Sequence, residues 1–135
     1  IDITDYNKEG AYLLGWSCDP NKAKKNKKTS KRKELFMWHA NYHPDGGQLF
    51  YPLDNKPFIS PLALPGDNIS IDSFKAFYFD GSQGLYIHPN IWHEGVFPLS
   101  EKAKFFDKQG KVHARISCDF ASEFKSYLSF ALKEL

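Results

Sequence analysis

Cysteine is scarce in this sequence, and the two cysteines stand far apart. Cys18 and Cys118 form no CxxC pair and no ladder with histidines. Structural zinc sites need closely spaced thiolates and imidazoles, so we expect no such site here. We interpret both side chains as free thiols in a reducing compartment, and we predict a cytoplasmic protein.

Long apolar runs are also absent. No stretch reaches the ~18 apolar residues that suggest a transmembrane helix, and no signal peptide is recognisable. We therefore expect no membrane partner. The chain has 135 residues, of which 41% are hydrophobic and 16% aromatic. This size and composition suit a single domain, 1–135, with a modest core and no need of disulfides.

One segment lacks acidic residues altogether. Residues 22–33, KAKKNKKTSKRK, carry eight Lys or Arg side chains. The rest of the chain then holds ten basic against sixteen acidic side chains, a balance of −6. Such a run can contact nucleic acid or a membrane, or can be a solvated loop. Because it has no interleaved aromatic residue and no amphipathic period, we predict a mobile loop and no nucleic-acid partner.

Short strand-like segments between turns make up most of the chain. There is no βαβ unit and no glycine-rich phosphate loop, and the pattern predicts an all-β barrel or sandwich. We expect hairpins at 35–53 and 85–99, whereas 70–79 could form a short helix or a strand. The expected strands are 11–19, 34–44, 48–53, 58–64, 85–89, 90–99, 103–106 and 111–120.

The C-terminal segment has a different period. Its apolar residues recur three and four positions apart, at Phe124, Tyr127, Leu128, Ala131 and Leu132. This spacing is typical of an amphipathic helix, and a serine at position 122 could cap it. We therefore predict a short C-terminal helix after the strands.

Two stretches concentrate the residues that can carry chemistry. Residues 41–58 read NYHPDGGQLFYPLDNKPF, and residues 77–99 read FYFDGSQGLYIHPNIWHEGVFPL. Their pattern resembles the two motifs of a cupin barrel, with His43 and Gln48 in the first motif and His93 in the second. The resemblance implies a cupin-like β-barrel, or jelly roll, with a ligand in the barrel mouth.

A cupin metal site needs about three or four strong nitrogen or oxygen ligands. This sequence offers two imidazoles and the neutral amide oxygens of Asn41 and Gln48, which bind transition metals weakly. We therefore expect no cofactor. If a divalent metal is bound, we expect its ligands to be His43, Gln48, His93 and Glu94.

Both stretches resemble more closely the ureidoglycolate lyase family. The family's first stretch typically reads E-R-H-P-x-G-x-Q-x-F-x-P-L, and this chain matches it at His43, Pro44, Gly46, Gln48, Phe50, Pro52, Leu53 and Phe58. The second stretch is matched at Phe77, Gly81, Gln83, Gly84, Trp92 and His93. The departures include Asn41 and Tyr42 in place of the Glu-Arg pair, and Glu94 in place of a second histidine.

The resemblance implies a homodimeric lyase that splits ureidoglycolate into glyoxylate and urea in allantoin and purine degradation. Histidine can serve as acid or base near neutral pH, and we predict catalytic roles for His93, His88 and Gln83. The substrate carboxylate requires donors such as Lys56 or Arg115. The predicted substrate-binding residues are His43, Gln48, Tyr86, Asn90, Trp92, Lys56 and Arg115.

Two other functions remain compatible with the sequence. A metal-dependent cupin lyase or isomerase could act on another small carboxylic acid, or the barrel could bind a small molecule without catalysis. We expect Glu94 to point away from the cavity, because neighbouring strand residues face opposite sides. As an anion beside His93, Glu94 should raise the pKa of that imidazole.

Overall fold

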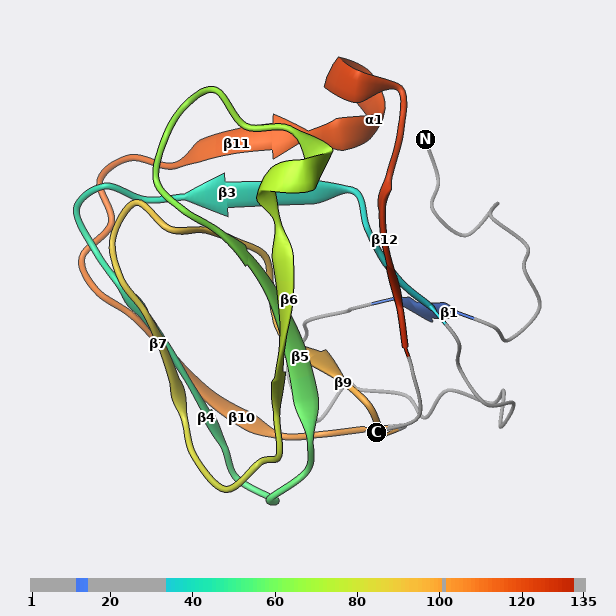
Figure 1. Cartoon of the computed structure of the whole chain (residues 1–135). Coiled ribbons are helices and arrows are strands. Elements are labelled where there is room, and N and C mark those ends of the chain that lie inside the picture. Colours follow the sequence, from blue (N-terminus) through green and yellow to red (C-terminus); the bar gives the residue numbers. More distant parts are fainter. Residues whose placement is uncertain (1–11, 15–33, 101, 133–135) are drawn as a thin grey trace.

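The structure, a computed structural model, describes residues 12–14, 34–100 and 102–132. The basic run 22–33 and Cys18 lie outside these residues. The regular structure of the described chain is almost entirely β-strand, mostly in antiparallel pairs, with one short α-helix, which confirms the predicted all-β, cupin-like class (Figure 1). No described helix has the length and apolar character needed to cross a membrane.

The strands form three sheets. The terminal sheet has the order β1-β2-β12, with β1 (Tyr12–Leu14), β2 (Glu34–Met37) and β12 (Leu128–Ala131). The facing sheet has the order β10-β4-β7, with β4 (Gln48–Pro52), β7 (Leu85–Ile87) and β10 (Phe105–Gln109). The major sheet has the order β11-β3-β8-β5-β6, with β9 also paired to β5. Its strands are β3 (His39–Tyr42), β5 (Phe58–Ala63), β6 (Lys75–Phe79), β8 (Trp92–His93), β9 (Phe97–Pro98) and β11 (Ile116–Asp119).

The major sheet and the facing sheet enclose the interior of an open barrel (Figure 1). No pairing between described strands joins the two sheets, so β6 and β7 are sheet edges that remain unpaired with each other. Phe58 of β5 connects the layers through its side chain, because its ring stacks on Phe79 and meets Phe105 of the facing sheet edge-on. These aromatic side chains therefore fill part of the interior between the two sheets.

Both predicted hairpins, at 35–53 and 85–99, are wrong. Strand β3 pairs with β8 and β11, whereas β4 pairs with β7 and β10. The chain thus crosses from one sheet to the other at 43–47 and returns at 88–91. The two crossings lie side by side, since Asn90 N donates to the His43 carbonyl oxygen at 3.1 Å. Sequence alternation reveals the strands, but only the pairing reveals that each turn bridges two sheets.

Several strand boundaries also differ from the prediction. Residues 34–44 split into β2 and β3, and 70–79 contain both a 3-10 turn at Ile71–Ser73 and strand β6. Residues 107–110 were expected to form the turn between the strands 103–106 and 111–120, which is wrong over most of its length, because β10 continues to Gln109 and pairs with β4.

The largest apolar core lies on the outer face of the major sheet. Ala40, Ile59 and Trp92 of that face pack with residues of the terminal sheet and of helix α1 (Phe120–Phe124). Because side chains alternate along a strand, the positions next to these core residues face the barrel interior. The packing of the outer core thereby determines which side chains point into the barrel interior.

The short C-terminal helix is present but ends earlier than the apolar period suggests. Asp119 caps α1, accepting a hydrogen bond from Ser122 N at 3.0 Å, and Lys125 ends it in the left-handed conformation with φ 55°. The following residues form β12 instead, in which Leu128 pairs with Met37 of β2 and is 1% exposed. The apolar residues at 128, 130 and 132 also fit the period of a strand, and pairing with β2 favours the strand over the helix.

Candidate functional site

Two imidazoles meet in the barrel interior. His43 follows directly after β3 and His93 ends β8. Asn41 is the cross-strand partner of His93, so strand alternation directs both histidines to the interior. The ring centroids lie 4.9 Å apart with an interplanar angle of 82°. The two side chains are 2% and 3% exposed, which makes them a buried pair rather than a surface patch.

Gln48 joins this pair from the opposite sheet. Its Oε1 lies 3.0 Å from His93 Nε2, and its Nε2 donates to Asp107 Oδ1 at 2.8 Å. Gln109 Nε2 donates to the same Gln48 Oε1 at 3.2 Å. Because an ionised carboxylate only accepts hydrogen bonds, Asp107 determines which end of the Gln48 amide faces His93.

His43 presents one nitrogen with no partner. Its Nδ1 lies within hydrogen-bonding distance of the Gly46 carbonyl oxygen. Since a carbonyl oxygen only accepts, Nδ1 carries the proton and Nε2 of the neutral ring is an acceptor. This Nε2 is buried and has no hydrogen-bond partner. A buried acceptor without a partner costs free energy, so His43 Nε2 can gain by accepting a hydrogen from a bound molecule.

Both nitrogens of His93 face acceptors. Nδ1 lies 2.8 Å from the Ile91 carbonyl oxygen, while Nε2 faces Gln48. Only the protonated ring could donate to both. Burial has the largest effect, however, and it holds the pKa of His93 below its usual value, against the opposing effect of the Ile91 carbonyl. The ring is therefore mainly neutral near pH 7, although its surroundings can accommodate a second proton.

Arg115 supplies positive charge to this region. It precedes Ile116, which pairs with Tyr42 next to His43. Its charge also contributes to the lowered pKa of His93. Lys56 lies elsewhere, in the loop before β5, where it donates to the Lys102 carbonyl oxygen at 2.8 Å. Of the two predicted cations, Arg115 is the one whose charge lowers the pKa of His93.

Glu94 is paired with a residue other than His93. Its carboxylate accepts from His39 Nδ1 at 2.8 Å and from Gly95 N at 2.9 Å. The carboxylate is therefore hydrogen-bonded to His39 and to the backbone, and to neither member of the imidazole pair. Its charge raises the pKa of His93, as predicted, but burial has the larger effect and the pKa of His93 is lowered overall.

The described side chains do not assemble the alternative set of metal ligands. Among the described residues, no group of three or more His, Cys, Asp or Glu side chains is placed to hold a metal ion. Nε2 of His43 is open, but Nε2 of His93 faces the Gln48 amide and the Glu94 carboxylate is engaged with His39. The donor set therefore does not fit a cupin metal centre.

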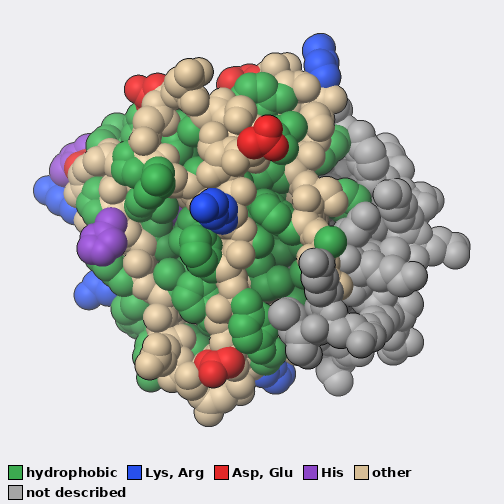
Figure 2. All heavy atoms as spheres, viewed as in Figure 1, with side chains coloured by type: hydrophobic (Ala, Val, Ile, Leu, Met, Phe, Trp, Pro, Cys, Tyr) green, Lys and Arg blue, Asp and Glu red, His purple; other side chains and the backbone are tan. Residues whose placement is uncertain are grey.

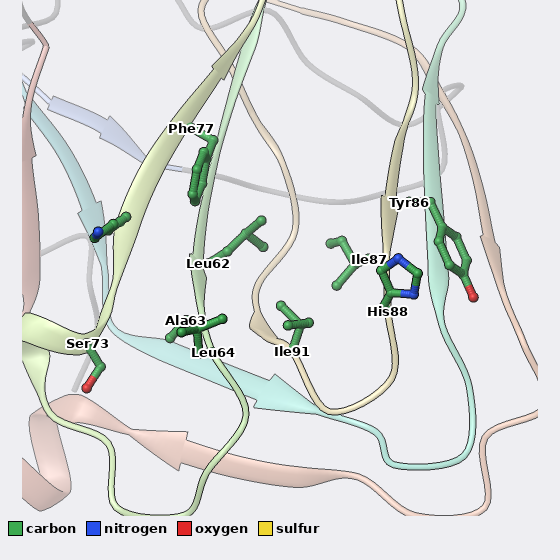
Figure 3. A pocket seen from close by; sticks show the side chains of 10 residues that line it. Leu62, Ala63, Leu64, Ser73, Phe77, Tyr86, Ile87, His88 and Ile91 are labelled. Carbon is green, nitrogen blue, oxygen red and sulfur yellow. The ribbon is translucent and has the colours of Figure 1, made fainter.

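His88 and Tyr86 lie at a cavity between β6 and β7, apart from the imidazole pair. Their rings meet edge-on with centroids 4.9 Å apart, and both side chains are exposed. Figure 3 shows Ile87, between them, pointing into the cavity while Tyr86 points away from it. The structure thus brings His43, and not His88, next to His93.

The remaining predicted residues are spread over the molecule. Trp92 belongs to the outer core, where its Nε1 donates to the Gly66 carbonyl oxygen at 2.7 Å, on the face of β8 opposite to His93. Gln83 and Asn90 are exposed. Gln83 lies in the loop between β6 and β7, at the lower end of the barrel in Figure 1, whereas the crossings at 43–47 and 88–91 lie at the upper end.

Two polar residues of the site were missed by the sequence analysis. Asp107 and Gln109 were assigned to a turn, yet both extend β10 and reach Gln48. The sequence held no signal for them, because residues 107–109 are all polar and show no alternation of apolar and polar side chains. Gly110 favoured the prediction of a turn, because glycine is common in turns.

We expect Glu94→Gln to change kcat/KM for the proposed substrate by less than about tenfold, or roughly 1.4 kcal/mol. Glu94 acts on His93 only through its charge, which raises that pKa. Removing the charge should lower the pKa of His93 further and shift the acidic limb of the pH–rate profile to lower pH. Steady-state kinetics between pH 5 and 8 test this, and abolished turnover would show that Glu94 takes part in the chemistry.

Sequence comparisons place these features in a family. A family model described as ureidoglycolate lyase matches residues 5–122. The ureidoglycolate lyase of Escherichia coli O139:H28 (strain E24377A / ETEC) is 30% identical over 99 residues, which cover 72% of this chain and 59% of that protein. Those of the E. coli strains SMS-3-5 / SECEC and K12 / DH10B are 32% identical over 99 residues. The chain spans 59% of the length of these relatives. Because the family model covers most of the chain, including both stretches that supply the buried imidazoles, this protein belongs to the ureidoglycolate lyase family.

Proposed function

We propose that this protein cleaves ureidoglycolate into glyoxylate and urea. Family membership supports the reaction class, and the names of the relatives support the substrate. The observation that carries the proposal is the buried His43–His93 pair, in which one imidazole has an open acceptor and the other faces two acceptors.

The reaction requires one proton to leave an oxygen and one to reach a nitrogen. As the hydroxyl proton of the substrate is removed, the carbon–oxygen double bond of glyoxylate forms and the carbon–nitrogen bond breaks. The electron pair of that bond goes to the urea nitrogen, which must then be protonated. A single histidine with access to both atoms can take the first proton and return it to the second.

His93 has the properties of such a proton carrier. In the neutral ring, Nε2 is an acceptor that faces another acceptor, Gln48 Oε1, so a substrate hydroxyl would be a better partner. Once protonated, the ring can donate through Nδ1 to the Ile91 carbonyl and through Nε2 to the urea nitrogen. His43 Nε2 would accept a hydrogen bond from the substrate and orient it, as its buried lone pair is unpaired.

Neither imidazole of the pair lines the cavity between β6 and β7. Leu62, the cross-strand neighbour of His93, lines that cavity. Adjacent strands are about 4.8 Å apart, so the cavity wall comes within one strand of His93. Because both imidazoles are almost fully buried, the substrate reaches them only when a neighbouring side chain such as Gln48 moves.

We expect Arg115→Gln to raise KM about tenfold with a smaller change in kcat. The guanidinium would bind the substrate carboxylate, and a hydrogen bond to a charged group is worth ~1.5–3 kcal/mol when buried and less at an exposed site such as this. Lys108→Gln is the matched control. Lys108 is an exposed cation on β10 that pairs with Leu49, next to Gln48. Because side chains alternate along a strand, Lys108 faces away from the side on which Gln48 meets His93. A KM that is equal in both variants would exclude Arg115 as the carboxylate ligand.

The decisive experiment is a coupled assay for glyoxylate formation from ureidoglycolate by the purified chain. Glyoxylate reduction with NADH gives a continuous absorbance signal, and urea is measured independently in the same samples. Equal amounts of both products, above the uncatalysed rate, support the proposal. A folded protein that produces neither would overturn it.

We also propose a pathway, a cellular location and an oligomeric state for this protein. We place the reaction in allantoin and purine degradation and the protein in the cytoplasm, as a homodimer. These three statements are supported by the resemblance of the two motif stretches to the family, and the oligomeric state is directly testable by sedimentation.

A further inference from the structure

The cavity between β6 and β7 has a volume of about 390 Å³ and mainly apolar walls. Figure 3 shows Phe77 and Leu62 on the wall formed by β5 and β6, facing Ile87 on the opposite wall, with Ile91 between them. A volume of this order falls in the range typical of small-molecule sites, ~300–1,000 Å³. The cavity is therefore large enough for an organic ligand.

Large apolar side chains are exposed at the cavity and beside it. In β6, Phe77 is 45% and Tyr78 is 48% exposed, although they face opposite sides of the strand. Leu64, which also lines the cavity, is 80% exposed. Figure 2 shows hydrophobic side chains gathered over this face with few charged groups among them. Exposed apolar area around a concavity is a common mark of a binding site.

Lys75 brings a positive charge to this apolar cavity. It pairs across the strands with Leu62, so both side chains are directed to the same face, and both line the cavity. Leu62 in turn pairs with His93 on its other side. Across the sheet, the side chains of His93, Leu62 and Lys75 therefore lie in that order. Within the described residues Lys75 has no ion pair with an acidic side chain, so its ammonium group is available to a bound anion.

We propose that this cavity binds a carboxylic acid with an apolar chain or ring, whose carboxylate meets Lys75 and whose body contacts Phe77, Leu62 and Ile87. The apolar walls do not suit ureidoglycolate, which carries polar groups along its whole length, so the ligand is a different molecule from the proposed substrate. The site is separated from His93 by Leu62 and does not depend on the lyase activity.

Binding of a series of straight-chain carboxylates to the whole protein, from butanoate to decanoate, tests the apolar contacts by isothermal titration calorimetry. Each added CH₂ should lower Kd by roughly threefold to fourfold until the cavity is filled, after which Kd should level off. Octan-1-ol serves as the uncharged partner of octanoate. A Kd that does not depend on chain length would overturn the proposal.

Two pairs of measurements assign the binding to this cavity. Phe77→Ala should weaken octanoate binding at least tenfold, whereas Tyr78→Ala, on the same strand with similar exposure but the opposite face, should leave it within twofold. Lys75→Gln should weaken octanoate binding about two- to fivefold, as expected for an exposed ion pair, and leave octan-1-ol binding unchanged. Circular dichroism confirms that the variants are folded.

Equal losses in Phe77→Ala and Tyr78→Ala would contradict a ligand inside the cavity. If both variants also dissociated a dimer in sedimentation, the exposed aromatics of β6 would belong to an interface between copies of this chain, and the small-molecule proposal would fail. If octanoate and octan-1-ol bind equally well, and Lys75→Gln weakens neither, then the carboxylate makes no contribution to binding and that part of the proposal is wrong.

Discussion

His93→Ala should leave a folded protein whose kcat for glyoxylate release is about 10²–10⁴-fold lower, the usual contribution of a general acid–base group. His93 is the one imidazole of the site with hydrogen-bond acceptors at both nitrogens, and its pKa is lowered mainly by burial. It is therefore neutral when the substrate arrives, and its protonated form is stabilised once it has taken the hydroxyl proton. No other described side chain combines these two properties.

The sign of the pH dependence follows from the lowered pKa. Below that pKa, His93 is protonated before the substrate binds and cannot accept the hydroxyl proton. We therefore expect kcat/KM of the wild-type protein to fall at acidic pH, with a midpoint below the usual value of ~6.5 for histidine. An acidic midpoint above that value would contradict the assignment of His93 as the base.

His88→Ala provides the matched control for His93→Ala. His88 is exposed and contacts only Tyr86 among the described rings, so its removal should change kcat by less than about tenfold. Thermal melts of both variants separate loss of fold from loss of chemistry. If His88→Ala inactivates the protein while His93→Ala retains a near wild-type kcat, the proposed roles of the two histidines must be exchanged.

Phe58→Ala should lower the free energy of unfolding by about 3–5 kcal/mol, the usual cost of removing a buried phenylalanine ring. Phe58 is 0% exposed. Its ring stacks on Phe79 at 4.8 Å and meets Phe105 at 5.1 Å, with interplanar angles of 10° and 88°. Since no described strand pairing joins the two sheets of the barrel, the contact of Phe58 with Phe105 connects them through side chains.

Phe106→Ala is the corresponding control for stability. Phe106 neighbours Phe105 on β10 but is 51% exposed, so we expect a change below about 1 kcal/mol. Urea denaturation measured by tryptophan fluorescence gives both values. A small effect of Phe58→Ala would mean that the sheets are joined mainly by other contacts, such as the hydrogen bond between Gln48 and His93.

Resemblance of two stretches to a known family was enough to single out His43, Gln48 and His93, and the structure brings these three together. The motif positions alternate with core residues, and the period of two fixes the face on which each side chain lies. His88 and Gln83 were selected from the second of these stretches, but both lie outside β7 and are exposed, and only the tertiary structure shows that neither lies next to His93.

By itself, the sequence determined the all-β class, most strand positions, the family and the histidine pair, because these depend on local periodicity and on motif residues. The tertiary structure decided which strands pair, that 43–47 and 88–91 cross between sheets, and that 128–131 form a strand and not a helix. It also placed Asp107 and Gln109 at the site and set the balance between burial and hydrogen bonding at His93. These features depend on contacts between residues far apart in the chain, and local patterns carry no information about such partners.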